Sequence, residues 1–200
     1  MPQFGLKGIK CAKYVNTSGT ISYTDAQKVG DAMTAQLELR YAEGRLYAED
    51  TLAEYMKKAV GGTISLGVKY IETAAQKLMF GMRENSRNIT YIPTGTTVTA
   101  TATAKSLVIG GHDEGVYVGI AFYAPDMVDG VRKYTCVLIR KALFGPPSMS
   151  LQTAGESIQF NTPTTSGEFL ADDSSDQNLF EVVIVDDENE AKAWITAALA

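Results

Sequence analysis

Residues 61–81, GGTISLGVKYIETAAQKLMFG, decide the fold class because two different hydrophobic periods follow each other within them. In the first half apolar residues alternate with polar or small ones, as in a half-buried strand; they are Ile64, Leu66, Val68 and Tyr70. From position 71 the apolar residues recur at the spacing of one helical face; they are Ile71, Ala74, Ala75, Leu78 and Met79. Gly81 follows where a helix commonly ends. We therefore predict a strand followed directly by a short flanking helix over 71–80.

The segment before this unit predicts a β-hairpin. Leu37, Leu39 and Tyr41 alternate with polar residues, which indicates a strand. Residues 42–44, Ala-Glu-Gly, have the composition of a short hairpin loop, so residues 45–50 are expected to return as the partner strand. The next apolar stripe fits either a short helix or an extended loop that stops at glycines 61 and 62; its members are Leu52, Tyr55, Met56, Ala59 and Val60.

The rest of the chain predicts more strands and a second helix. Further strands are expected at 116–122, 131–144, 157–160 and 179–185. Residues 131–144 are apolar on both faces, as in a central strand, and Pro146-Pro147 ends them. An apolar stripe over 188–199 predicts a helix within the C-terminal segment 186–200. Together these elements predict a single mainly β (α+β) domain over residues 1–200.

Residues 97–104 form a strand-like run with threonine on one face and Val98 followed by three alanines on the other. Two interpretations stay open. The strand either packs where there is little room, or it pairs with another subunit through its edge or its small-residue face. In the second case the inter-subunit strand carries Thr97, Thr99, Thr101 and Thr103.

The composition is that of a globular domain. Of the 200 residues, 45% are hydrophobic and 20% are charged, which is enough to build a core. No run approaches 18 apolar residues, so we expect no membrane-spanning helix. Residues 1–15 lack the pattern of a secretory signal. Cys11 and Cys136 lie within strand-like runs and are expected to be reduced and buried.

The charge is distributed unevenly along the chain. The net charge of −5 argues against a protein that binds nucleic acid tightly, because such binding relies on Lys and Arg neutralising phosphates. Residues 1–141 sum to +4, whereas residues 142–200 sum to −9 with Lys192 as their only base. The acidic region is either a solvated face or a surface that repels a polyanion or meets a basic patch.

The sequence offers no constellation for catalysis, a metal or a cofactor. His112 is the only histidine and lies in a glycine-flanked polar segment, which favours a turn over a metal site or a catalytic triad. The acidic run that begins at Asp172 does not fit a calcium-binding loop, because Gln177 and Val183 occupy the positions of the required glycine and glutamate. The sequence contains neither of the glycine-rich phosphate-binding motifs G-x-x-x-x-G-K-[ST] and G-x-G-x-x-G. We therefore expect no enzyme, no metal and no cofactor.

In the order of these segments and in their residue patterns, the chain resembles the major tail proteins, or tail tube proteins, of long-tailed phages that infect Gram-positive bacteria. The similarity covers roughly residues 4–170. Its strongest signals are Leu46-Tyr47-Ala48-Glu49-Asp50 and the strand–helix unit from Gly61 to Gly81. The resemblance implies a β-sandwich or half-barrel with a flanking helix, six copies of which close into a ring. Stacked rings would form the tube through which phage DNA leaves the capsid.

The resemblance also implies where the subunits meet and what surrounds them. We place ring-to-ring stacking on residues 43–62, with apolar contacts from Leu46, Tyr47, Tyr55 and Met56. An acidic bore would let DNA slide without counterion release; the acidic surface expected for it holds Asp172, Asp173 and Asp176. The implied partners are a tail-tip initiator, a tape measure protein and a tail terminator. The protein would be assembled in the bacterial cytoplasm and reside in the virion tail.

Two alternative functions stay open at this point. The first is the tube protein of a contractile tail or a related injection apparatus, which shares the fold implied by the resemblance. The second belongs to a different class, a β-rich module that binds a carbohydrate or a receptor. Such a module favours exposed aromatic residues on loops, whereas Trp194 lies on the predicted C-terminal helix and most tyrosines lie in predicted strands.

Overall fold

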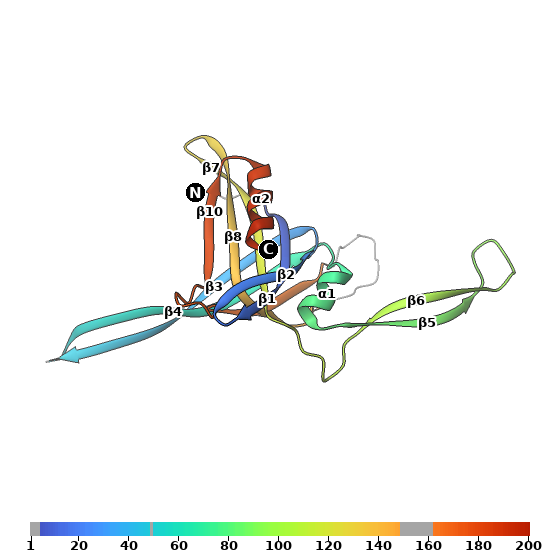
Figure 1. Cartoon of the computed structure of the whole chain (residues 1–200), viewed down its shortest axis with the longest axis horizontal. Helices are drawn as coiled ribbons and strands as arrows, with labels where there is room; N and C mark the ends of the chain where they lie inside the picture. Colours follow the sequence, from blue (N-terminus) through green and yellow to red (C-terminus); the bar gives the residue numbers. More distant parts are fainter. Residues whose placement is uncertain (1–4, 49, 149–161) are drawn as a thin grey trace, which may run out of the picture.

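The computed structural model describes residues 5–48, 50–148 and 162–200, and it is mainly β, as predicted. Figure 1 shows a central body from which two long hairpins project in opposite directions. The strands are β1 (Lys7–Thr17), β2 (Thr20–Lys28), β3 (Ala32–Ala48), β4 (Thr51–Val68), β5 (Arg83–Tyr91), β6 (Ala100–Val108), β7 (Val118–Val128), β8 (Val131–Phe144), β9 (Thr164–Leu170) and β10 (Phe180–Val185). The helices are α1 (Thr73–Phe80) and α2 (Glu188–Ala198). The strand predicted at 157–160 lies outside the described residues.

The body is an antiparallel sheet of eight strands in the order β2-β1-β7-β8-β9-β4-β3. The eighth strand, β10, pairs with β8 on the same side as β9, further toward the start of β8. Strand β8 spans Val131–Phe144 and has partners along both edges, which confirms the predicted central strand. Its residues also contribute to two separate apolar cores, one on each face of the sheet.

The larger core lies on the face that carries α1. Buried residues of β1, β4, β7, β8, β9 and α1 meet there, with Phe80 and Phe169 as the largest. Helix α1 begins at Thr73, two residues later than predicted, because Glu72 is still extended. It ends at Gly81, which adopts a left-handed φ of 67°. A Cβ at this position would approach the backbone oxygen of Glu114 to 2.3 Å, so the close packing also requires glycine.

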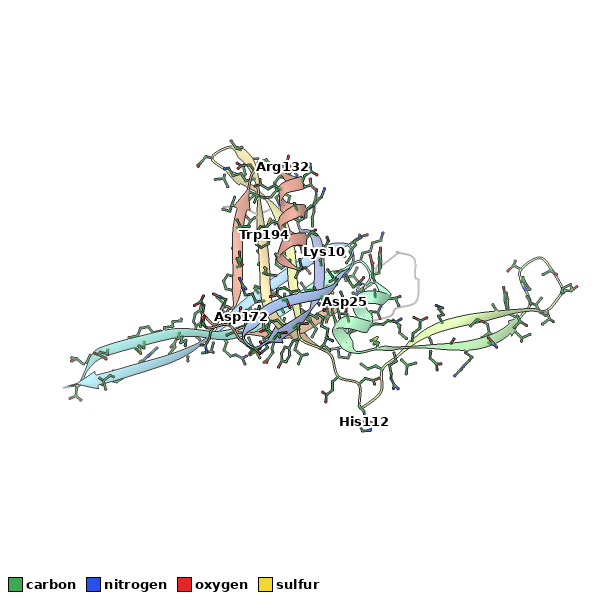
Figure 2. All side chains as sticks on the ribbon, in the orientation of Figure 1. Lys10, Asp25, His112, Arg132, Asp172 and Trp194 are labelled. Atoms are coloured by element: carbon green, nitrogen blue, oxygen red, sulfur yellow. The ribbon has the colours of Figure 1, made fainter. Side chains whose placement is uncertain are left out.

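Helix α2 covers the opposite face of the sheet and closes the smaller core. Asp187 is the N-cap of α2, and its carboxylate accepts a hydrogen bond from the amide of Asn189 at 2.5 Å. Ala191 and Ile195 are buried against β7 and β8, and Trp194 packs at the margin of the same core (Figures 1 and 2). The predicted helix and its apolar stripe are confirmed.

The region from residue 42 to residue 60 differs from the predictions. Residues 42–44 form no hairpin loop, because β3 runs through them to Ala48 and Gly44 pairs with Met56. The stripe over 52–60 is neither a helix nor a loop but part of β4. This segment pairs with β3, and its apolar residues Tyr55, Met56 and Val60 are exposed, so no core contact depends on their helical spacing. The ladder has a bulge where Val60 lies opposite the junction of Arg40 and Tyr41 without a partner of its own.

The predicted strand over 97–104 also shifts. The strand β6 covers Ala100–Val108, and it pairs along its whole length with β5, which the sequence analysis did not predict. These two strands form a separate sheet. Strand β2 is a further addition to the predicted elements.

Both cysteines are buried and unpaired with each other, as predicted. Burial raises the pKa of the Cys11 thiol to about 12 and that of Cys136 to about 11. We therefore expect neither thiol of the folded protein to react with a thiol reagent at pH 8, whereas both should react after unfolding in guanidinium chloride. Rapid labelling of one thiol per folded chain would contradict the burial of that residue.

Candidate assembly surfaces

The described part of the chain holds no cluster of three or more metal-ligating side chains. His112 lies exposed in the loop between β6 and β7 and points away from the body (Figure 2). Among the same residues, no helix has both the length and the apolar character needed to cross a membrane. The prominent features are instead the two hairpins and one edge of the sheet, so these surfaces are the candidate site.

The distal part of the β3–β4 hairpin, residues 41–59, is called arm 1 here. Residues that pair across the two strands have their side chains on the same face. On one face of arm 1, charged and aromatic side chains contact one another across the strands. The Lys57 ammonium lies 3.2 Å from the Glu43 carboxylate and 4.2 Å from the centre of the Tyr41 ring. On the same face the Arg45 guanidinium lies 5.6 Å from the centre of the Tyr55 ring. Because the opposing groups satisfy one another, this face holds the two strands together.

The other face of arm 1 is more apolar. Gly44 pairs with Met56 and Leu46 pairs with Glu54, so these four side-chain positions lie together and line a shallow groove. Met56 is 78% exposed and Leu46 is 58% exposed. The predicted stacking residues therefore do not form one patch. Leu46 and Met56 share a face, whereas Tyr55 lies on the opposite face.

Tyr47, the remaining predicted stacking residue, lies beyond a second bulge close to the tip of arm 1. It pairs with Leu52 and is 61% exposed. All four predicted residues are thus on arm 1 and open to solvent, although on different faces.

The β5–β6 hairpin, residues 83–108, is called arm 2 here. One face is polar, with Thr101 and Thr103 exposed and the Thr103 hydroxyl donating to the side-chain oxygen of Asn88 at 3.0 Å. The opposite face also carries Arg87 and is apolar over its distal half; its apolar members are Ile89, Tyr91, Ala100, Ala102 and Ala104. Thr97 and Thr99 lie in the connection before β6, so of the four predicted threonines only two belong to the strand.

The base of arm 2 is fixed to α1 by an ion-pair network. The Glu84 carboxylate contacts the Lys77 ammonium from α1 and lies 2.9 Å from the Lys105 ammonium of β6. These two hydrogen-bonded ammonium groups lower the pKa of Glu84 to about 2. The carboxylate is therefore ionised at neutral pH, where it can pair with both ammonium groups.

Strand β10 contributes the third surface. It pairs with β8 through consecutive residues from Phe180 to Val185 without a bulge, and its other edge has no partner in the described chain. The face that points away from α2 carries Phe180, Val182 and Ile184, which are 39–50% exposed. The sequence analysis predicted this strand but did not predict that one of its apolar faces stays open.

The predicted acidic surface is only partly a surface. Asp172 is 3% exposed, so its assignment to the surface is wrong. Its carboxylate accepts hydrogen bonds from the amides of Ser174 and Asn178 and pairs with the Arg140 guanidinium at 3.5 Å. Asp173 is exposed and pairs with the Lys141 ammonium at 2.7 Å, which lowers the pKa of this carboxyl. Asp176 is exposed in the same loop.

Sequence reasoning missed three features of these surfaces: the length of arm 1, the existence of β5 and the open face of β10. A signal was available only for the last of them, because Phe180, Val182 and Ile184 alternate as in a strand with a second apolar face.

Comparison with protein-family models and with curated proteins finds no match to the chain.

Proposed function

We propose that this protein is a structural subunit that assembles with copies of itself, and that the assembly is a phage tail tube built from stacked hexameric rings. The observation that carries the proposal is the pair of hairpin arms. Each is a two-stranded ribbon with large apolar side chains open to water, and such ribbons are marginally stable on their own. A neighbouring subunit would supply the surface that each arm lacks.

The directions of the arms favour a head-to-tail assembly. They leave the body on opposite sides (Figure 1), so the two arms of one subunit would reach two different neighbours, as in a head-to-tail contact. A contact of this kind closes into a ring when the rotation between subunits fits. The body with α1 on its flank is compatible with the sandwich or half-barrel expected of tail tube subunits.

The charge supports a passage for DNA. Residues 142–200 carry a net charge of −9, and a bore lined by such a region would release no counterions from DNA. Of the acids expected to line it, Asp176 is the one that is exposed and has no ion pair in the described chain. In the tail, the tube would extend from a tip initiator to a terminator and enclose the tape measure protein, with assembly in the bacterial cytoplasm.

Negative-stain electron microscopy of the purified protein, with mass from light scattering, tests the proposal. Rings or tubes with a central hole are the expected result. A species of about 21.6 kDa that stays monomeric at high concentration and binds a glycan would overturn the proposal and favour a carbohydrate-binding module.

A substitution on arm 1 should separate folding from stacking. Met56→Asp places a charge on the exposed apolar face of the arm, where burial against a neighbour would be costly. We expect unchanged thermal unfolding of the monomer and at least a tenfold loss of tube length or yield in micrographs.

Met127→Asp is the matched control, because it makes the same chemical change at an exposed position near the β7–β8 turn, away from both arms. Tubes of normal length from Met56→Asp would rule out this face of arm 1 as a stacking contact. An equal loss for both variants would mean that added charge, and not its position, prevents assembly.

A further inference from the structure

The outer edge of β10 lacks the features that usually protect an edge strand. Edge strands of monomeric proteins commonly carry a lysine, a proline or a bulge. Strand β10, with the sequence FEVVIV, has none of these and keeps a regular register with β8. Its one charged residue, Glu181, is held at 2.8 Å by the Arg140 guanidinium on the face toward α2. The edge is therefore ready to accept another strand.

Arm 2 has the matching features. Its strands pair without a bulge, and in the described chain the outer edge of β5 has no partner. Arg87, Ile89 and Tyr91 lie on one face of β5, since they are two residues apart. Ile89 and Tyr91 are 41% and 47% exposed, which resembles the exposure of the apolar residues on β10.

The charges of the two regions are complementary. Residues 83–108 hold three basic residues and one acidic residue, whereas residues 180–190 hold five acidic residues and no basic one. Within the described chain, Arg87 on arm 2 has no ion-pair partner, and Asp186 beside β10 pairs only with Lys133. A contact between the two regions would supply a carboxylate for Arg87.

Arm 2 and the outer edge of β10 cannot meet within one molecule, because the arm extends away from the side on which β10 lies (Figure 1). We propose that arm 2 of one copy adds to the outer edge of β10 of a neighbouring copy, with β5 antiparallel to β10. This inference rests on the self-assembly proposed above and names the surfaces that produce it.

The antiparallel arrangement can pair every side chain on the shared face. With Ile89 opposite Val182, Tyr91 falls opposite Phe180 and Arg87 falls opposite Ile184, one diagonal step from Asp186. The register thus joins two aromatic rings, two aliphatic side chains and a guanidinium near a carboxylate. Backbone hydrogen bonds would extend the eight-stranded sheet into the next subunit.

Cysteine cross-linking tests this register. Ile89→Cys and Val182→Cys are made in separate chains, mixed in equal amounts and oxidised under mild conditions. The two native thiols are buried, so they do not compete. Each single variant alone is one control, and Leu46→Cys on arm 1 mixed with Val182→Cys is the other. Both substituted positions are exposed, so folding should be unaffected, which thermal unfolding verifies.

The expected result is a covalent dimer from the mixture that exceeds the yield of every control at least tenfold, and a ladder of multimers when both cysteines are in one chain. Dimers of Val182→Cys alone would overturn the proposal in favour of symmetric β10 pairing, and an efficient link to Leu46→Cys would assign β10 to arm 1. Rings in micrographs without the 89–182 link would overturn this contact and leave the assembly proposal intact. Monomers without the link would overturn both.

Discussion

Replacing Phe169 with alanine is expected to lower the free energy of unfolding by about 3–5 kcal/mol. Phe169 is fully buried in the larger core and lies opposite Gly62 on β4 and Ala142 on β8. A Cβ on Gly62 would lie 2.6 Å from its ring, so the glycine leaves the space that the ring fills. Alanine at 169 would leave a cavity at the point where β9 joins β4 to β8, and relaxation of the strands could close only part of it.

Phe180→Ala is the matched control for this prediction. The same atoms are removed, but Phe180 is 39% exposed on β10, so the expected loss is about 1 kcal/mol. Denaturant unfolding at a concentration at which the protein is monomeric measures both variants. Equal losses would contradict the placement of Phe169 at the centre of the core. Phe180→Ala should instead weaken assembly, because Phe180 belongs to the open face of β10.

The second large effect is expected from Arg140→Met. Arg140 belongs to β8, and its guanidinium joins this strand to two other segments. It pairs with Glu181 on β10 and with Asp172 in the loop between β9 and β10, whose side chain is completely buried. Removal of the guanidinium would leave the Asp172 carboxylate buried without its cation, at a cost of about 3–5 kcal/mol. Hydrogen exchange of the Asn178 amide, which donates to Asp172 at 2.9 Å, should report the loosened loop.

Lys133→Met provides the comparison for the charge effect. It breaks a pair of 2.8 Å with Asp186, which is 80% exposed, so we expect a loss of about 0–1 kcal/mol. Adding Asp172→Asn to Arg140→Met should recover part of the stability, because no uncompensated charge then stays buried. A loss for Arg140→Met no greater than that for Lys133→Met would show that Asp172 does not depend on this cation.

The sequence was informative wherever burial imposes a period. The strand at 131–144 and both helices were predicted because one or two of their faces are buried, so apolar residues recur at the spacing of the element. The arms lack this constraint. In residues 83–91 every position is exposed, so the mixture RENSRNITY contains no alternation that could reveal a strand. The apolar residues of 52–60 fell at helical spacing for the same reason, since no core selects their positions.

The candidate surfaces show a second limit of prediction from sequence. Asp172 looked like a surface acid because its partner, Arg140, is 32 residues away and nothing local links the two. The separation of Tyr55 from Leu46 and Met56 depends on strand register, which a misplaced hairpin turn obscured. A hairpin was predicted in this part of the chain, but its turn was placed at 42–44 and not beyond Ala48, and its faces could be assigned only from the ladder.

The bulge at Val60 would have a consequence for the geometry of the proposed assembly. It lies where arm 1 leaves the body, and a bulge bends and twists the strand pair in which it occurs. In the proposed assembly, the direction of the arm would fix where the next subunit lies, and thus the rotation and rise from one copy to the next. Deleting Val60 would retain every residue pair of the arm while straightening its path. One unpaired residue would then govern the symmetry and the helical pitch of the assembled particle.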